Sequence, residues 1–391
     1  MTNEVLQKTA SDEQNVSSSN GLEPLPKLRF LEFKNTYKKT KLNEAVERIQ
    51  RRDPTSEAPV MMLSAASGFI MQSEKYSREN AGQSLKKYIL LRKGELAYNH
   101  GASKYKPFGC CFELKEDEAR IPYVYHCFAV KENNDKSYIA RLLNNQKIDQ
   151  QLKRLISSSV RMDGLLNISY EEYTGIDLYL PSLLEQQKIA DFLFLVDRRI
   201  EKQRQLVESL KKYKRGALSR VFNDVLETVK LSDISNFISS ARTLSTTLNG
   251  NKGIYPVYDA AGIAGYIDYY DIDSDYITIV KDGSGVGRLQ KCDKKSSFIG
   301  TLGALVAKNC TTDFLYAVLQ TIDFSKFVTG MAIPHIYYRD YKSTLLPFPS
   351  EEKQHFISQL LKKFDIYIEN ETQKLTNMLA YKQGLLQQMF I

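Results

Sequence analysis

Two stretches of this chain decide its fold: PSLLEQQKIADFLFLVDRRIEKQRQLVESLKKYKRGALSRVF at residues 181–222, and PSEEKQHFISQLLKKFDIYIENETQKLTNMLAYKQGLLQQMF at residues 349–390. They align without a gap at a shift of 168 residues, and fourteen of the 42 positions are identical. Chance would supply about two or three identities, so the chain contains an internal duplication.

Both copies carry one apolar seam, with the alternating steps of three and four residues that are typical of a coiled coil. Its polar interruptions fall at matching places, Gln203/Glu371 and Lys214/Lys382. A lone helix cannot bury so narrow a stripe, so we expect the two helices to pair antiparallel about an approximate two-fold axis. The alternative is two unrelated surface helices. The seam positions are Ile189, Leu193, Val196, Ile200, Gln203, Val207, Leu210, Lys214, Ala217 and Val221, then Ile357, Leu361, Phe364, Ile368, Glu371, Leu375, Met378, Lys382, Leu385 and Met389.

The segments before the two helices also correspond. TKLNEAV at 40–46 is similar to VKLSDIS at 229–235, and NISYEEY at 167–173 matches HIYYRDY at 335–341, again shifted by 168. Alternating apolar and turn-rich segments predict α+β domains with a twisted, largely antiparallel sheet. We expect strands at 88–94, 123–130 and 276–281, short helices at 137–143 and 312–320, and a glycine-rich turn at 282–287. The predicted order is a disordered tail (1–24), a first mixed α/β domain (25–180), a coiled-coil helix (181–224), a second mixed α/β domain (225–348) and a second coiled-coil helix (349–391).

Charge is concentrated in two places, although the net charge is only +8. Residues 27–52 hold nine Lys and Arg against three Glu, and residues 181–222 hold ten against five acidic residues. Such local positive surface attracts phosphate backbones, but solvated helix faces would show the same pattern. No stretch approaches the roughly 20 apolar residues of a membrane span, and the first residues lack a signal-peptide pattern. We therefore expect a cytoplasmic protein.

The residues for catalysis are missing from the sequence. The chain has no Pro-Pro dipeptide of the kind that holds an extruded base in amino methyltransferases, and no phosphate-binding G-x-x-x-x-G-K-[ST] loop. Glu113-Leu-Lys115 is the nearest fragment of a nuclease site, and no suitably spaced Asp precedes it. The five cysteines form no C-x-x-C pair, which predicts reduced thiols without a zinc ribbon or disulfide framework. The four histidines are scattered, so we expect no catalytic site and no metal site.

The repeated plan resembles the specificity (S) subunit of type I restriction-modification systems. The motifs that carry the resemblance are the two Pro-Ser helix starts with Gln and Ile, YKRGAL at 213–218, YKQGLLQQMF at 381–390, YPVYDAAGIAGYI at 255–267 and GSGVGR at 283–288. The first domain lacks the last two strings, and the loop at 98–106 is its expected counterpart.

The resemblance implies two target-recognition domains, each reading one half of a bipartite DNA site, with the helices fixing the spacer. It also implies two docked modification subunits that carry S-adenosylmethionine and methylate adenine N6. Restriction subunits that use ATP and Mg would cut unmethylated DNA. The chain itself would bind no cofactor and would not be an enzyme. The alternatives are a stand-alone nuclease or methyltransferase, and a coiled-coil scaffold that binds proteins.

Candidate DNA contacts lie in glycine-flanked, basic loops, because phosphates attract Lys and Arg and base edges need side chains that fork or stack. In the second domain they are Lys281, Ser284, Arg288, Lys291, Lys294 and Lys295, and in the first they are Asn99, His100, Ser103, Lys104 and Lys106. The alternative for each of these residues is an ordinary exposed side chain that does not contact DNA. We also expect the basic face of the first helix to lie over the spacer DNA or to bind an acidic partner. Its residues are Arg198, Arg199, Lys202, Lys211 and Lys212.

Overall fold

The computed structural model describes residues 6–8, 25–75, 82–101, 103, 106–156, 166, 168–239, 248, 253–330 and 332–391. The chain divides into two compact units, residues 1–202 with 375–391, and residues 203–374. Two long helices, α6 (Leu183–Asn223) and α10 (Glu351–Met389), supply residues to both units. None of the helices that the structure describes is long and apolar enough to cross a membrane.

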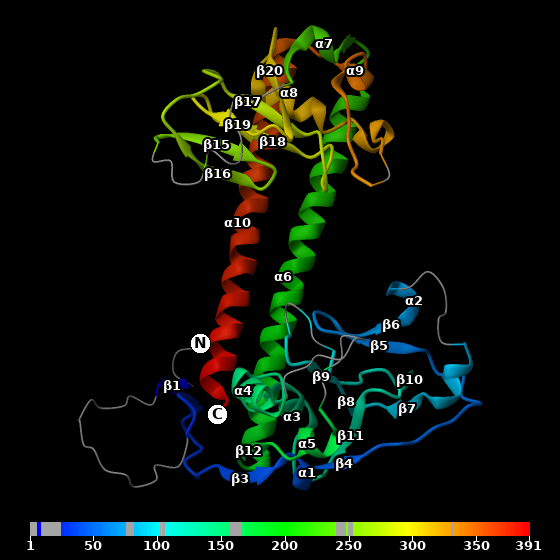
Figure 1. The fold of residues 1–391 in the computed structure, drawn as a ribbon. Helices are drawn as coiled ribbons and strands as arrows, with labels where there is room; N and C mark the ends of the chain where they lie inside the picture. Colours follow the sequence, from blue (N-terminus) through cyan, green and yellow to red (C-terminus); the bar gives the residue numbers. More distant parts are fainter. Residues whose placement is uncertain are drawn as a thin grey trace. The chain divides into compact units, whose positions relative to one another are not determined.

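Unit 1 is built on the four-stranded antiparallel sheet β4-β11-β8-β9 (Figure 1). Its strands are β1 (Leu6–Lys8), β2 (Leu28–Phe30), β3 (Lys38–Lys41), β4 (Val46–Arg48), β5 (Met61–Ser64), β6 (Gly68–Met71), β7 (Ile89–Arg92), β8 (Leu96–Asn99), β9 (Cys110–Glu113), β10 (Glu118–Ile121), β11 (His126–Val130) and β12 (Asp177–Leu180). Its shorter helices are α1 (Leu42–Ala45), α2 (Gln72–Lys75), η1 (Gly82–Lys87), α3 (Lys136–Leu142), α4 (Gln146–Leu155) and α5 (Tyr170–Thr174). Three residues of the expected tail form β1, which pairs with β2, and the rest of residues 1–24 lies outside the described residues.

Unit 2 contains the four-stranded antiparallel sheet β14-β20-β17-β18 and the three-stranded sheet β16-β15-β19. Its strands are β13 (Thr228–Lys230), β14 (Ser235–Ile238), β15 (Tyr255–Asp259), β16 (Gly262–Ile267), β17 (Tyr276–Val280), β18 (Leu289–Cys292), β19 (Ser297–Phe298), β20 (Leu302–Ala307) and β21 (Leu345–Pro347). Its shorter helices are α7 (Leu231–Ile234), α8 (Thr312–Leu319), η3 (Phe324–Phe327) and α9 (Tyr338–Tyr341).

The two units repeat one topology. The strand order β4-β11-β8-β9 of unit 1 corresponds to β14-β20-β17-β18 of unit 2, and β3 pairs with β12 as β13 pairs with β21. The similar segments 40–46 and 229–235 both run through a short helix, α1 or α7, into the outer strand of the four-stranded sheet. The predicted mixed, largely antiparallel fold is confirmed, and the β15–β19 pair is parallel.

The apolar seam of the long helices is confirmed, because every seam residue is buried or half-buried. In unit 2, the Gln203 Nε2 group donates to the Glu371 carboxylate at 2.7 Å, and Lys214 pairs with Asp365 at 2.6 Å. Higher numbers in α6 thus meet lower numbers in α10, which is the predicted antiparallel pairing. In unit 1, Asp197 pairs with Lys382 at 2.6 Å. A shift of 168 residues converts each of these ion pairs into the other, so the two units repeat the same contact between the helices.

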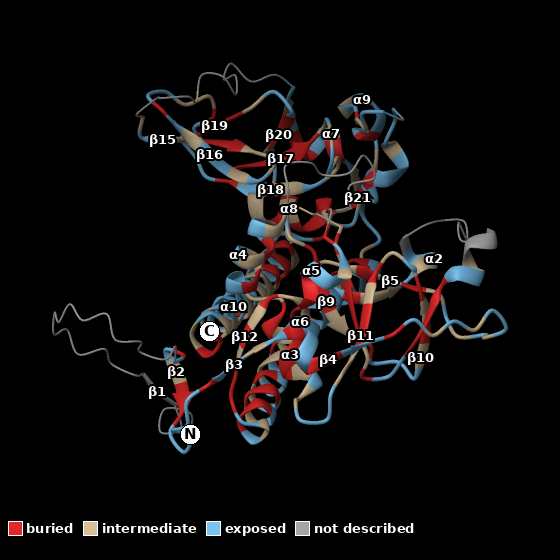
Figure 2. Cartoon of the chain, turned by 60° about the horizontal axis from the view of Figure 1, so that its bottom comes forward, coloured by how far each residue is buried: buried red, intermediate tan, exposed pale blue. Residues whose placement is uncertain are grey.

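Each unit's core uses the start of one long helix and the end of the other, and Figure 2 shows buried residues in the sheets and along the helices. Unit 1 packs Ile189 and Leu193 with Phe390, and unit 2 packs their counterparts Ile357 and Leu361 with Phe222. Complete burial of one such side chain contributes about 1.5–3 kcal/mol. The helix pair is therefore part of both cores.

Candidate nucleic-acid interface

The connection between β17 and β18 is a glycine-rich turn at residues 281–288. Gly283, Gly285 and Gly287 have φ angles of +93°, +94° and +84°, a region that side chains with a Cβ rarely adopt. The Gly287 N–H donates to the Val280 carbonyl at 2.8 Å, which closes the turn. The sequence prediction of a turn here is confirmed, and its backbone can approach a ligand closely.

A second segment, residues 329–336, is hydrogen-bonded to this turn. The Gly283 N–H donates to the Pro334 carbonyl, and the Ile336 N–H donates to the Lys281 carbonyl, both at 2.9 Å. Thr329 and His335 exchange backbone hydrogen bonds of 2.9 and 2.8 Å, so the segment folds back on itself. The turn and this segment form one surface, although they are about 50 residues apart in the chain.

The six predicted contacts of unit 2 lie in or after this turn, and most of their cationic groups already have partners. Lys281 donates to the Ser239 carbonyl at 2.7 Å, Arg288 donates to the Ala260 carbonyl, and Lys291 forms an ion pair with Asp313. The first of these side chains is half-buried and the other two are exposed. Ser284, Lys294 and Lys295 are exposed as well. Nothing in this arrangement separates phosphate contacts from base contacts, so these assignments stay predictions.

We expect Gly287→Ala to damage the turn. A Cβ at this position would lie 2.7 Å from the Phe324 Cβ, and the positive φ disfavours any side chain. The free energy of unfolding should fall by about 1–3 kcal/mol. Thermal or urea unfolding checks this loss. Gly300→Ala is the matched control, because its Cβ would meet nothing within 4 Å. An equal loss in both variants would contradict the argument.

The corresponding loop of unit 1 joins β8 to β9, which confirms its predicted equivalence to the glycine-rich turn. Asn99 is half-buried, donates to the Leu63 carbonyl at 3.3 Å and accepts from the Gly101 N–H at 2.9 Å. Ser103 and Lys106 exchange hydrogen bonds within the loop, and the Lys106 ammonium donates to the Asn144 carbonyl at 2.9 Å. Lys104 lies outside the described residues. Asn99, Ser103 and Lys106 thus hold the loop in shape, and their contacts with DNA stay predictions.

His100 does not fit its predicted contact with DNA. It is 6% exposed, and its ring nitrogens lie 2.7 Å from the Leu166 carbonyl and 2.9 Å from the Val124 carbonyl. Its ring stacks on His126 at 5.0 Å. Burial lowers the pKa of His126 to about 4, so that imidazole is neutral near pH 7. The prediction for His100 is therefore corrected: its buried ring links its own loop to the segments that contain Val124 and Leu166, and does not face solvent.

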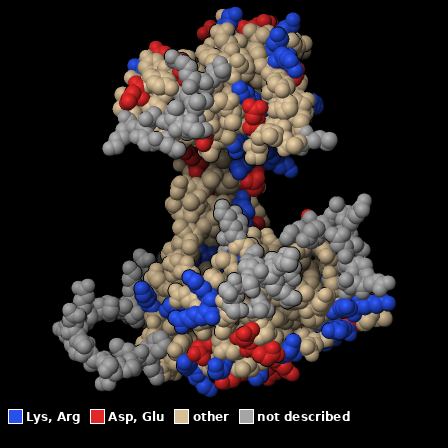
Figure 3. Space-filling model, in the orientation of Figure 1, with Lys and Arg blue, Asp and Glu red and all other residues tan. Residues whose placement is uncertain are grey.

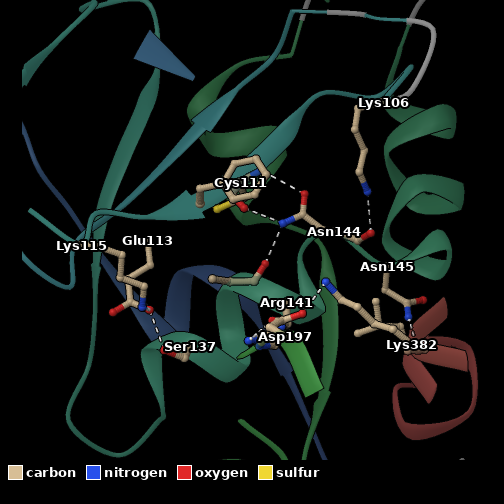
Figure 4. A pocket seen from close by; sticks show the side chains of 13 residues that line it. Lys106, Cys111, Glu113, Lys115, Ser137, Arg141, Asn144, Asn145, Asp197 and Lys382 are labelled. Carbon is tan, nitrogen blue, oxygen red and sulfur yellow. Dashed lines mark hydrogen bonds and ion pairs between the residues drawn. The ribbon is translucent and has the colours of Figure 1, made fainter. Parts of the chain in front are cut away.

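A cavity of about 350 Å³ lies beside Lys106, between β9, α3 and the parts of α6 and α10 in unit 1 (Figure 4). Its charges are largely paired. Asp197 binds both Arg141 at 2.8 Å and Lys382 at 2.6 Å, and Glu113 binds Lys115 at 2.6 Å. Because these cations have carboxylate partners, the cavity is better explained as a polar junction between the sheet and the helices than as an anion site.

The basic residues predicted on the first helix are all exposed on α6. The Arg198 guanidinium lies 5.9 Å from the Phe194 ring, and Lys211 pairs with Glu208 at 2.8 Å. On the faces in view in Figure 3, acidic and basic side chains are interspersed in each unit. Partner binding by Arg198, Arg199, Lys202, Lys211 and Lys212 stays a prediction.

The cysteine side chains in the structure are not activated. All five cysteines are free, and burial raises the pKa of Cys110, Cys292 and Cys310 to about 11. Their thiols stay protonated near pH 7 and are poor nucleophiles. Among the described residues, no three His, Cys, Asp or Glu side chains group together in a way that could hold a metal ion.

Sequence reasoning missed the exposed side chains that follow the 329–336 segment. Tyr337 is 45% exposed, and the guanidinium of Arg339 lies 4.7 Å from its ring. The sequence held a signal, because HIYYRDY and NISYEEY share one Ile and two Tyr but differ at 335, 337, 339 and 340. Only the fold shows that Ile336, the residue before Tyr337, is hydrogen-bonded to the glycine-rich turn.

Comparison with known proteins finds similarity to type I specificity proteins. Residues 223–379 match the model of the type I restriction modification DNA specificity domain. The chain is also similar to a Mycoplasma pneumoniae protein described as a type I specificity subunit, with 29% identity over 151 residues, or 37% of this chain. That match spans 49% of the relative, so the chain covers about half the length of this curated relative.

The fold is similar to those of solved type I proteins. The S subunit of a type I restriction-modification system from M. genitalium superposes with a TM-score of 0.57 at 15% identity, covering 94% of this chain and 99% of that one. A chain from a study of complex assembly and conformational transition in the type I system gives a TM-score of 0.54 at 16% identity, with 90% and 97% covered. At these identities the likeness establishes the fold alone.

Proposed function

We propose that this protein is the DNA-reading subunit of a type I restriction-modification system, because residues 223–379 match the type I restriction modification DNA specificity domain and the chain has the fold of a solved type I S subunit. Unit 1 and unit 2 would each read one half of a bipartite site in cytoplasmic DNA. The long helices would set the spacer and dock two modification subunits.

The repeated topology is the observation that supports this proposal most directly. Two sheets with the same strand order each have one loop, 100–109 or 281–288, at the same place between corresponding strands. Two related surfaces with different side chains suit two different half-sites. The helix pair, whose ion pairs interchange under the 168-residue shift, suits a two-fold arrangement of partners.

The partner subunits would catalyse both methylation and DNA cleavage. The modification subunits would supply S-adenosylmethionine and methylate adenine N6, and restriction subunits would use ATP and Mg to cut unmethylated DNA. This chain's residues would bind and orient the duplex. Affinity should then fall steeply as salt rises, because phosphate contacts release counterions.

A domain exchange tests the proposal. Residues 25–180 are replaced by those of a related chain, and the methylated motif of the host genome is sequenced with the modification subunits present. We expect one half-site to change while the other half and the spacer persist. A change in both half-sites would overturn the proposal that each unit reads one half-site. Methyl transfer or DNA cleavage by the purified chain alone would overturn the assignment to a reading subunit.

A further inference from the structure

We propose that Tyr337 and Arg339, supported by His335, read base edges in the half-site of unit 2. This inference rests on the proposed function and names the residues that would carry its sequence preference. It differs from the sequence-based candidates, which are Lys281, Ser284 and Arg288 in the neighbouring turn.

The backbone places this group at the candidate interface. His335 is bonded through its backbone to Thr329, and its neighbours Pro334 and Ile336 are bonded to the glycine-rich turn. Tyr337 follows directly and leads into α9. The group therefore projects from backbone that the turn holds in place, which limits the conformational entropy lost on binding DNA.

The side chains have the chemistry that base recognition needs. The His335 and Tyr337 rings meet edge to face, with their centroids 5.0 Å apart. The Arg339 guanidinium lies over the Tyr337 ring, 4.7 Å from its centroid. The ion pair of Arg339 is with its sequence neighbour Asp340 at 3.5 Å, and the Arg339 side chain is 75% exposed. An aromatic ring that orients an exposed guanidinium favours bidentate contact with guanine, the commonest specific contact in the major groove.

The internal repeat separates framework positions from variable ones in this segment. Ile336, Tyr338 and Tyr341 are buried or half-buried, and the same residue types stand at their counterparts, Ile168, Tyr170 and Tyr173. The exposed positions between them differ, with Ser169 and Glu171 in place of Tyr337 and Arg339.

In unit 1 the two differing side chains, Ser169 and Glu171, interact with neighbouring parts of the protein. Ser169 caps α5, and Glu171 pairs with Arg48 at 3.2 Å. The charge at the second position is therefore reversed between the copies. Phosphate contacts carry no sequence information, because the backbone of DNA is the same at both half-sites. A base contact is expected to differ between them.

The test uses the complete chain assembled with its modification subunits. Methylation rates are measured on the cognate duplex and on duplexes with one base pair changed in the half-site of unit 2, which the domain exchange identifies. For Arg339→Gln, we expect the preference for one base pair of this half-site to fall by about tenfold or more. Preference at the other half-site should not change.

Lys326→Gln is the matched control, because Lys326 is 74% exposed on η3 and pairs with the nearby Asp323. Tyr337→Ala should weaken the same base preference, whereas Tyr337→Phe should keep it because the ring remains. The unfolding midpoint of each variant shows whether it is folded.

Three outcomes distinguish the proposals. An unchanged base preference in folded Arg339→Gln would overturn the inference. A uniform loss on every duplex, with a salt slope reduced by about one, would also overturn it by making Arg339 a phosphate contact. Failure of the unaltered chain to direct methylation to any bipartite site would instead overturn the proposed function.

Discussion

Glu185→Ala is expected to destabilise unit 1 by about 3–5 kcal/mol, because it leaves a buried guanidinium without its carboxylate. Arg29 is 8% exposed and Glu185 is 1% exposed. Two hydrogen bonds of 2.7 and 2.8 Å join them, and the Tyr37 hydroxyl donates to the same carboxylate at 3.1 Å. Burial raises the pKa of Tyr37, so its hydroxyl stays protonated and remains a donor. Urea unfolding followed by circular dichroism measures the loss.

Two further variants show whether burial is the cause. Lys188→Ala removes an exposed ion pair with Glu32 and should cost less than about 1 kcal/mol. Arg29→Met combined with Glu185→Leu should recover much of the lost stability, because no unpaired charge stays buried. A loss below about 1 kcal/mol for Glu185→Ala would contradict this account and would mean that Arg29 reaches water in the variant.

The helix pairing could be read from the sequence because it repeats over 42 positions. Even its polar interruptions proved informative, since Gln203 meets Glu371 across the pair. The partners of Lys214 and Lys382 were not evident, because Asp365 and Asp197 lie beside the seam rather than on it. The Arg29–Glu185 pair joins positions 156 residues apart, and no local pattern indicates such a contact.

The site was less predictable than the fold. Glycines marked the 281–288 turn correctly, since their positive φ angles are a local property. Burial depends on distant segments, which is why His100 looked like a surface residue in a basic loop. Tyr337 and Arg339 escaped notice for the same reason, because long-range backbone hydrogen bonds, from Gly283 to Pro334 and from Ile336 to Lys281, bring the segment before them to the turn.

A seven-residue insertion in both long helices, after Gln203 and after Glu371, is expected to lengthen the DNA spacer by about three base pairs. Seven helical residues add roughly 10.5 Å at 1.5 Å per residue, and base pairs are about 3.4 Å apart along the duplex. A heptad also restores the seam to nearly the same face of each helix. Sequencing of the methylated motif measures the spacer, and both half-sites should be unchanged.

A four-residue insertion in α6 alone is the control for this prediction. It would shift Val207 and Leu210 out of register with α10 and leave Lys214 away from Asp365. Stability and methylation should both fall, whereas the paired heptads should preserve both. If the heptad variant methylates DNA with the original spacer, the helices do not set the distance between half-sites, and that part of the proposed function is wrong.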